Sequence, residues 1–143
     1  MKRAEEAKGI FLSGYSCSQA VLNAFAKENG MTKKAALKLA DAFGGGMGGM
    51  GKTCGAVTAA FMVIGLKYGR TKPKELAKKK KTRRLITLFS EKFKAKHGSL
   101  ECSELLGCNM GTEKGKKKAA ACGFFVKKCP EYVKFAVELL ENL

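Results

Sequence analysis

The residues of this sequence best suited to chemistry are its six cysteines. Four of them, Cys17, Cys54, Cys102 and Cys129, fall at or within the first turn of a predicted helix. Unpaired backbone N–H groups and the positive end of the helix dipole lower the pKa of a thiol placed there. If the four helix starts converge, the thiolates could hold a metal ion or an iron–sulfur cluster, or exchange a disulfide. The alternative for any one of them is a small buried apolar residue.

The expected compartment of the protein and the spacing of its cysteines limit which of these thiol functions are possible. The charged start of the chain is not followed by the apolar segment of a secretory signal, so we expect a cytoplasmic protein. In a reducing cytosol, cysteines are more often redox thiols or metal ligands than permanent disulfides. The sequence contains no C-x-x-C pair, which excludes the thioredoxin and zinc-ribbon patterns.

Cys54 follows a glycine-rich stretch, 44–55, that leads into the apolar segment 56–68. We expect Thr53 to cap a buried central helix that runs from Cys54 to Tyr68. Residues 46–53 fit the phosphate-loop formula G-x-x-x-x-G-K-[ST], but that motif requires a preceding strand, and residues 38–43 have a helical pattern. We therefore expect no nucleotide. The loop could still bind an anion through its N–H groups and Lys52, or its glycines could let the backbone pass close to a neighbouring helix.

Apolar residues recur at helical spacing along most of the chain, and no alternating strand pattern is present. The pattern predicts an all-α, single-domain bundle (1–143) of about six to eight helices around the central one. Thr32 and Ser99 are expected caps, Gly69 and Gly98 expected stops, and Pro130 should start the last helix and leave Cys129 extended. The lone histidine, His97, is expected in solvent near a helix end. The helices are expected at 4–13, 16–29, 32–43, 54–68, 71–97, 99–106, 119–127 and from 130, with a basic loop at 107–118.

The chain carries 28 Lys and Arg against 12 Asp and Glu, a net charge of +16. The run Lys78–Arg84 cannot face a core, so it is either solvated or in contact with a polyanion. The second functional hypothesis is therefore a basic helical nucleic-acid-binding module without redox chemistry, which would use this run, 114–118 and 127–128. Phe89, Phe93, Phe124 and Phe125 lie on apolar faces and are expected in the core. The apolar run 56–66 is too short to span a membrane.

Four segments together resemble the redox-active proteins named for the pattern C–GCAxxG–C–C. They are Tyr15–Val21, Gly44–Ala60, Glu101–Gly107 and Cys129–Val133, and the resemblance covers nearly the whole chain. The chain departs from the name pattern in reading Thr53-Cys54-Gly55-Ala56. The resemblance implies a small helical protein of anaerobic bacteria and archaea, with a redox or metal role for Cys17, Cys54, Cys102 and Cys129. A related module occurs in a multihaem cytochrome, but this chain has no C-x-x-C-H and no covalent haem is expected.

The predicted function is therefore that of an oxidoreductase or electron-transfer protein with clustered cysteine thiolates. The cluster either binds an iron–sulfur cluster, zinc or another metal ion, or cycles between dithiol and disulfide. Gly51 and Gly55 are added as candidate cofactor-binding positions. Cys108 and Cys122 lie outside the pattern and could be resolving thiols or inert. The redox partner could be acidic, and the apolar central helix could also serve a homodimer.

Overall fold

The computed structural model describes residues 2–143, and it is built from helices. Within this range there is no strand, and the one β-type pairing is an isolated antiparallel bridge between Thr53 and Glu101. The expected all-α class is confirmed. In chain order the elements are α1 (Lys2–Leu12), α2 (Cys17–Ala26), the 3-10 turn η1 (Lys27–Asn29), α3 (Lys33–Asp41), α4 (Gly55–Tyr68), α5 (Leu76–His97), α6 (Cys102–Leu106), α7 (Glu113–Ala121), α8 (Phe124–Lys127) and α9 (Cys129–Glu141).

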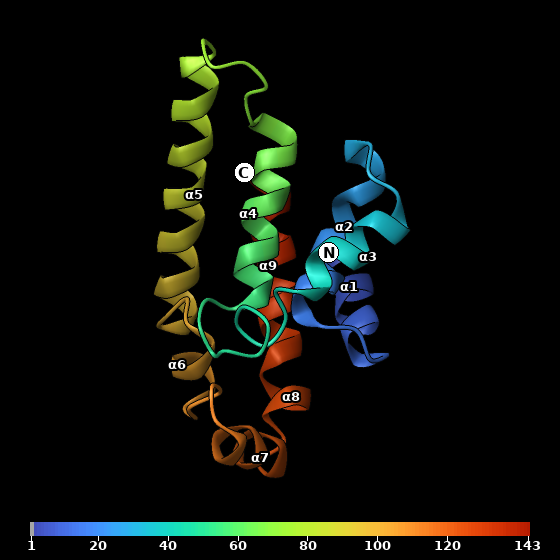
Figure 1. Ribbon diagram of the computed structural model, residues 1–143, viewed down its shortest axis with the longest axis vertical. Helices are drawn as coiled ribbons and strands as arrows, with labels where there is room; N and C mark the ends of the chain where they lie inside the picture. The colour runs from blue at the N-terminus through green and yellow to red at the C-terminus, as the bar shows by residue number, and fades with distance from the viewer. Residues whose placement is uncertain (1) are drawn as a thin grey trace.

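Helix α4 is the central element, as its composition predicts. It lies between α5 on one side and the α1–α3 group on the other, with α9 packed behind it (Figure 1). Val57, Ala60 and Val63 of α4 are fully buried. The helix can be buried because its own residues are apolar on nearly every face. The glycine loop and the short helices α6 to α8 gather near the N-terminal end of α4 (Figure 1).

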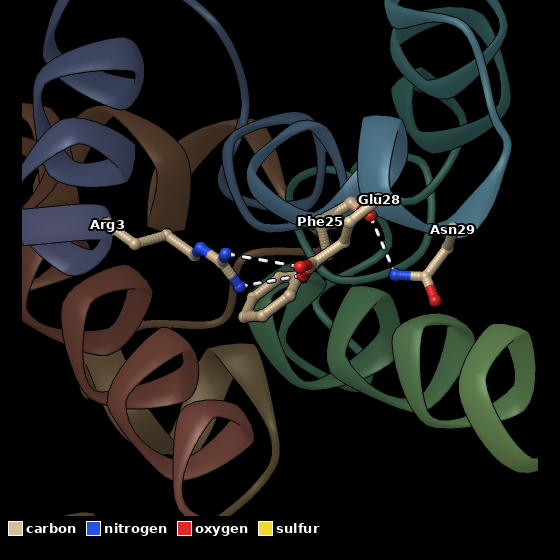
Figure 2. A network of polar contacts seen from close by, with 4 residues as sticks. All are labelled: Arg3, Phe25, Glu28 and Asn29. Atoms are coloured by element: carbon tan, nitrogen blue, oxygen red, sulfur yellow. Dashed lines mark hydrogen bonds and ion pairs between the residues drawn. The ribbon is translucent and has the colours of Figure 1, made fainter.

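The Arg3 side chain links α1 to the C-terminal end of α2. The Arg3 guanidinium donates two hydrogen bonds to the Glu28 carboxylate, at 2.7 and 3.3 Å, and lies 4.5 Å from the ring centroid of buried Phe25 (Figure 2). Asn29 donates a hydrogen bond to the Phe25 carbonyl at 2.8 Å, which closes the end of α2 (Figure 2). Together these contacts hold α1 beside α2, upstream of Cys17.

Several helix starts differ from the prediction. Thr53 is not the cap of α4, because it pairs with Glu101, and Cys54 is the N-cap residue. The long helix α5 begins at Leu76 instead of residue 71, since the Glu75 carboxylate accepts the N–H groups of Thr71 and Lys72 and holds a turn there. Helix α6 begins at Cys102 with Glu101 as its cap, and Ser99 does not cap it.

Three further expectations in the C-terminal third are wrong. Part of the expected loop 107–118 is helix α7, which the Thr112 hydroxyl caps by accepting from the Gly115 N–H at 3.0 Å. The expected helix 119–127 is interrupted at Gly123, whose left-handed conformation separates α7 from α8. Cys129 is helical, not extended, because α8 leads almost directly into α9 and Pro130 sits in the first turn, where no N–H is needed.

His97 is also misplaced by the prediction. Its ring is half-buried and contacts Phe93, Tyr132 and Phe135, with centroid separations of 4.8 to 5.1 Å. Its Nε2 atom has no hydrogen-bond partner among residues 2–143, and burial lowers the pKa of His97. His97 is therefore part of the aromatic packing between α5 and α9.

Candidate functional site

The four cysteines singled out by their sequence positions line one cavity of about 90 Å³. They are contributed by the beginnings of α2, α4, α6 and α9, so helix starts distant in sequence meet at one place. Apart from the sulfur atoms, the wall is mostly apolar. The other lining residues are Phe11, Ser16, Gly45, Leu105, Leu106, Met110, Phe125 and Tyr132.

Each cysteine lies at the N-terminal end of a helix. Cys17 is the first residue of α2, directly after the cap Ser16, whose side chain and that of Gln19 form a capping box. Cys54 is the N-cap of α4. Cys102 and Cys129 are the first residues of α6 and α9. The sequence predicts a helix start within two residues of each cysteine, although it places Cys102 in the third position of its helix and Cys129 just before its helix.

Backbone pairing fixes two of the cysteines relative to each other. The Cys54 N–H donates to the Leu100 carbonyl at 2.8 Å, and the Cys102 N–H donates to the Lys52 carbonyl at 2.7 Å. These bonds flank the bridge between Thr53 and Glu101. The starts of α4 and α6 are thereby held side by side, although nearly fifty residues separate them in the sequence.

The glycine loop packs its bare backbone against the cysteine-bearing segments. A Cβ atom on Gly55 would lie 2.6 Å from Cys17 Sγ, and one on Gly46 would lie 2.7 Å from Cys102 Cβ. Gly46 also has a φ of +70°, which side chains other than hydrogen rarely allow. Glycine is therefore required at these positions for close approach to the thiols. The phosphate-loop formula, by contrast, lacks its strand, because helix α3 precedes the loop.

Cys17 and Cys54 are a coupled pair of thiols in which Cys17 is the more acidic. The hydrogen bond from the Cys54 thiol, helped by N–H donors from Gly45, Ser18 and Ala56, lowers the pKa of Cys17 from 9.0 to about 7 against the effect of burial. The same hydrogen bond, together with burial, raises the pKa of Cys54 well above its usual range. One sulfur of this pair is thus nucleophilic near neutral pH, and its neighbour keeps a proton.

The other two cysteines of the cavity stay protonated. Burial, and then the negative charge on Cys17, raises the pKa of Cys102 to about 11 and that of Cys129 to about 12. Burial likewise raises the pKa of Tyr132 to about 12, and its hydroxyl donates to the Leu105 carbonyl at 2.9 Å. The helix N-termini therefore do not activate all four thiols equally, because burial outweighs the dipole at Cys102 and Cys129.

The remaining candidate residues are distributed differently. Gly55 contacts Cys17, whereas Gly51 packs against Ser103 and Gly111 and does not line the cavity. Cys108 is buried but absent from the cavity wall, and Cys122 is exposed.

The side chains around the cavity do not form a ready metal site. Among residues 2–143, no three His, Cys, Asp or Glu side chains lie close enough together to hold one ion. The fold brings four soft sulfur donors around one cavity, but as they stand they do not form a ligand set.

Sequence reasoning missed the apolar lining of the cavity. Tyr132 could have been found, because it lies one helical turn after Cys129 and shares its face. Phe11 follows the expected apolar face of α1 but carries no signal of a site. Phe125 was expected in the core, yet it is 37% exposed and forms part of the cavity wall.

The basic run is solvated, as its composition requires. Six of the seven residues from Lys78 to Arg84 are lysine or arginine; all but Lys79 of these six are exposed, and no residue of the run is buried. Phe89 and Phe93 are buried, as expected, and so offer no platform for bases. Nucleic-acid binding stays a prediction. No helix within residues 2–143 has the length and apolar character needed to cross a membrane.

Comparison with known proteins gives one match. A family model described as "Putative redox-active protein (C_GCAxxG_C_C)" matches residues 15–143. No curated protein and no solved structure matches the chain.

Proposed function

The chain belongs to the C_GCAxxG_C_C family of redox-active proteins, and on this premise we propose that it is a thiol–disulfide redox protein whose working pair is Cys17 and Cys54. The single observation that carries the proposal is the position of both sulfurs in the wall of one cavity, where their coupling lowers the pKa of Cys17 and raises that of Cys54. A nucleophilic thiolate beside a protonated thiol is the arrangement that disulfide exchange requires.

The reaction would proceed in two displacements. The Cys17 thiolate attacks one sulfur of a substrate disulfide, which forms a mixed disulfide with Cys17 and releases the other half of the substrate as a thiolate. Cys54 then attacks the Cys17 sulfur, which forms the Cys17–Cys54 disulfide and releases the second half. The Cys54 proton passes to a departing thiolate. Two electrons thus move from the protein to the substrate, and a dithiol reductant would reverse the process.

The surroundings support the pair. The N–H groups at the start of α2 and of Gly45 stabilise negative charge on Cys17, so the thiolate is ready before substrate arrives. Cys102 and Cys129 stay protonated and therefore do not compete as nucleophiles at neutral pH. Burial of the Cys54 sulfur keeps it inaccessible to anything but Cys17 or a molecule that has entered the cavity.

Exposure of the reduced protein to a small disulfide tests the proposal. We expect the loss of two free thiols per chain, with mass spectrometry of digested protein locating a Cys17–Cys54 disulfide. Cys54→Ser should stop the reaction at a mixed disulfide on Cys17, and Cys17→Ser should abolish it. Cys122→Ser, a change at an exposed cysteine outside the cavity, is the matched control. No reaction at Cys17, or a disulfide that omits it, would refute the proposal.

A metal ion or iron–sulfur cluster is the second candidate, favoured by the four soft donors around one cavity. Such a group would supply electron transfer or a structural link, but the sulfurs must first move closer together, so no step above is routed through it. Iron, zinc and visible absorption should be measured on protein isolated without oxygen. Stoichiometric metal that is lost in Cys102→Ser or Cys129→Ser would favour this candidate over the dithiol.

A further inference from the structure

A second hollow adjoins the cysteine cavity. It is an open pocket of about 400 Å³ on the surface between the glycine loop and helices α7 and α8. Gly45, Met110 and Phe125 line both hollows, so a single layer of residues separates them. The other residues of the outer pocket are Gly49, Lys116, Lys117 and Ala120.

The shared wall touches the reactive thiol. Gly45, one of its members, donates its N–H to the Cys17 sulfur. Phe125, another, belongs to the four-residue helix α8, which packs against α7 and α9. Its ring is 37% exposed, and the neighbouring Val126 is 69% exposed. Phe125 therefore stands in the wall shared by the outer pocket and the cavity that Cys17 lines.

The outer pocket combines an apolar floor with a cationic rim. Met110, Ala120 and Phe125 supply the floor. Lys116 reaches over the glycine loop, with Nζ 3.5 Å from where a Cβ on Gly49 would lie. Its ion pair with the exposed Glu113 is long at 4.0 Å and contributes little. The lysines of the rim thus attract anionic groups, and the apolar floor can contact the carbon and sulfur atoms of a ligand.

The sizes of the two hollows limit what can react. A cavity of about 90 Å³ holds about six to nine water-sized groups, since one water needs about 10–15 Å³ on this scale. It can admit a disulfide sulfur and the atoms next to it, but not a folded protein. The charged end of a small substrate can stay in the outer pocket, beside the lysines.

We infer that the outer pocket is the docking site for a low-molecular-weight anionic disulfide, with its carboxylates at Lys116 and Lys117 and its sulfur pair directed past Phe125 to Cys17. This inference rests on the proposed function and names its substrate class. The covalent step is the displacement already described: Cys17 bonds to one substrate sulfur, and the other half leaves as an anionic thiolate, which the same lysines attract.

Three disulfide probes that differ in charge test the inference. They are dithiodiglycolate, which is anionic, 2-hydroxyethyl disulfide, which is neutral, and cystamine, which is cationic. The rate of thiol loss from the reduced protein is measured with each probe and divided by the rate of a free small thiol with the same probe, which removes differences in probe reactivity. We expect the corrected rate to be highest for the anion and lowest for the cation.

A pair of double variants separates docking from general attraction. Lys116→Gln with Lys117→Gln removes the rim, and Lys114→Gln with Lys118→Gln removes the same charge from the same helix outside the pocket. The attraction between two carboxylate–lysine pairs, each about 6 Å apart in water, predicts that the first variant lowers the ratio of the anionic-probe rate to the neutral-probe rate about tenfold at low salt. The control should change the ratio less than about twofold, because screening weakens distant charges.

The outcomes distinguish this inference from the proposed function. Equal loss of the ratio in both double variants, or rates in the wild-type protein that do not depend on probe charge, would overturn the docking site and leave the Cys17–Cys54 chemistry intact. Failure of all three probes to react at Cys17 would refute both. Phe125→Ala, which opens the shared wall, should raise the rate with the neutral probe, and an unchanged rate would show that substrate enters elsewhere.

Discussion

Replacing Cys54 with alanine removes the hydrogen bond that contributes most to the low pKa of Cys17. The pKa of Cys17 lies about two units below its ordinary value of 9.0, and the three backbone donors would remain in the variant. We therefore expect Cys54→Ala to raise the pKa of Cys17 by about one unit, equivalent to about 1.4 kcal/mol. At pH 7 the thiolate fraction should fall from about one half to about one tenth.

The assay is the pH dependence of Cys17 alkylation by iodoacetamide, followed by mass spectrometry of the peptide that contains Cys17. This readout is specific for one thiol, so the other cysteines do not interfere. Cys54→Ser should shift the midpoint less than alanine does, because a hydroxyl can still donate. Cys102→Ala is the control: it removes a protonated thiol of the same cavity and should not raise the pKa of Cys17. A midpoint near pH 7 in Cys54→Ala would show that the hydrogen bond is not the cause.

Three further predictions concern stability. Gly55→Ala should destabilise the fold by about 1–3 kcal/mol in urea titrations, because its Cβ would lie 2.6 Å from Cys17 Sγ. Gly46→Ala should cost more, about 2–5 kcal/mol, since strain at positive φ adds to its contact with Cys102. Under reducing conditions, the free energy of unfolding should rise between pH 7 and 9, because Cys17 is ionised there only in the folded state. It should fall above pH 9, because Cys102 and Cys129 ionise there only in the unfolded state. Each of these thiols changes the free energy of unfolding by at most about 1.4 kcal/mol per pH unit.

Gly9→Ala provides the matched control for the two glycine variants. Gly9 lies within α1, and a Cβ there would meet nothing within 4 Å. Alanine should therefore stabilise the helix by about 0.5–1 kcal/mol. A loss of stability in this variant similar to that of Gly55→Ala would contradict the argument from close approach. A pH profile of stability that is flat from 7 to 9 would contradict the assignment of the thiolate to Cys17.

The parts of the fold that the sequence predicts well depend on local interactions. The start of α2 follows from Ser16 and Gln19, which satisfy each other's backbone N–H groups within four residues. The end of α5 follows from Gly98, which takes the left-handed conformation. The four cysteines could be placed near helix starts from short segments, although the expected caps Thr53 and Ser99 do not cap α4 and α6.

The predictions that failed concern features that depend on contacts between distant segments. Thr53 has the side chain of a cap, but its pairing with Glu101, nearly fifty residues away, holds it outside the helix. Helix α7 was missed because it buries only Gly115 and Ala119, too few residues for an apolar stripe. The convergence of the cysteines on one cavity, and the protonation of Cys102 and Cys129, likewise result from tertiary packing that no short segment encodes.

The cavity takes its walls from both halves of the chain, and α1 packs directly against α9 (Figure 1). During synthesis, a ribosome has released Cys17 and Cys54 long before the segment with Cys129 emerges. The nascent chain thus carries these sulfurs without their enclosing wall until α9 docks. Enclosure of the thiol pair is thereby coupled to synthesis of the segment that begins at Cys129, and a chain terminated before this segment has Cys17 and Cys54 but lacks the chamber that selects what reaches them.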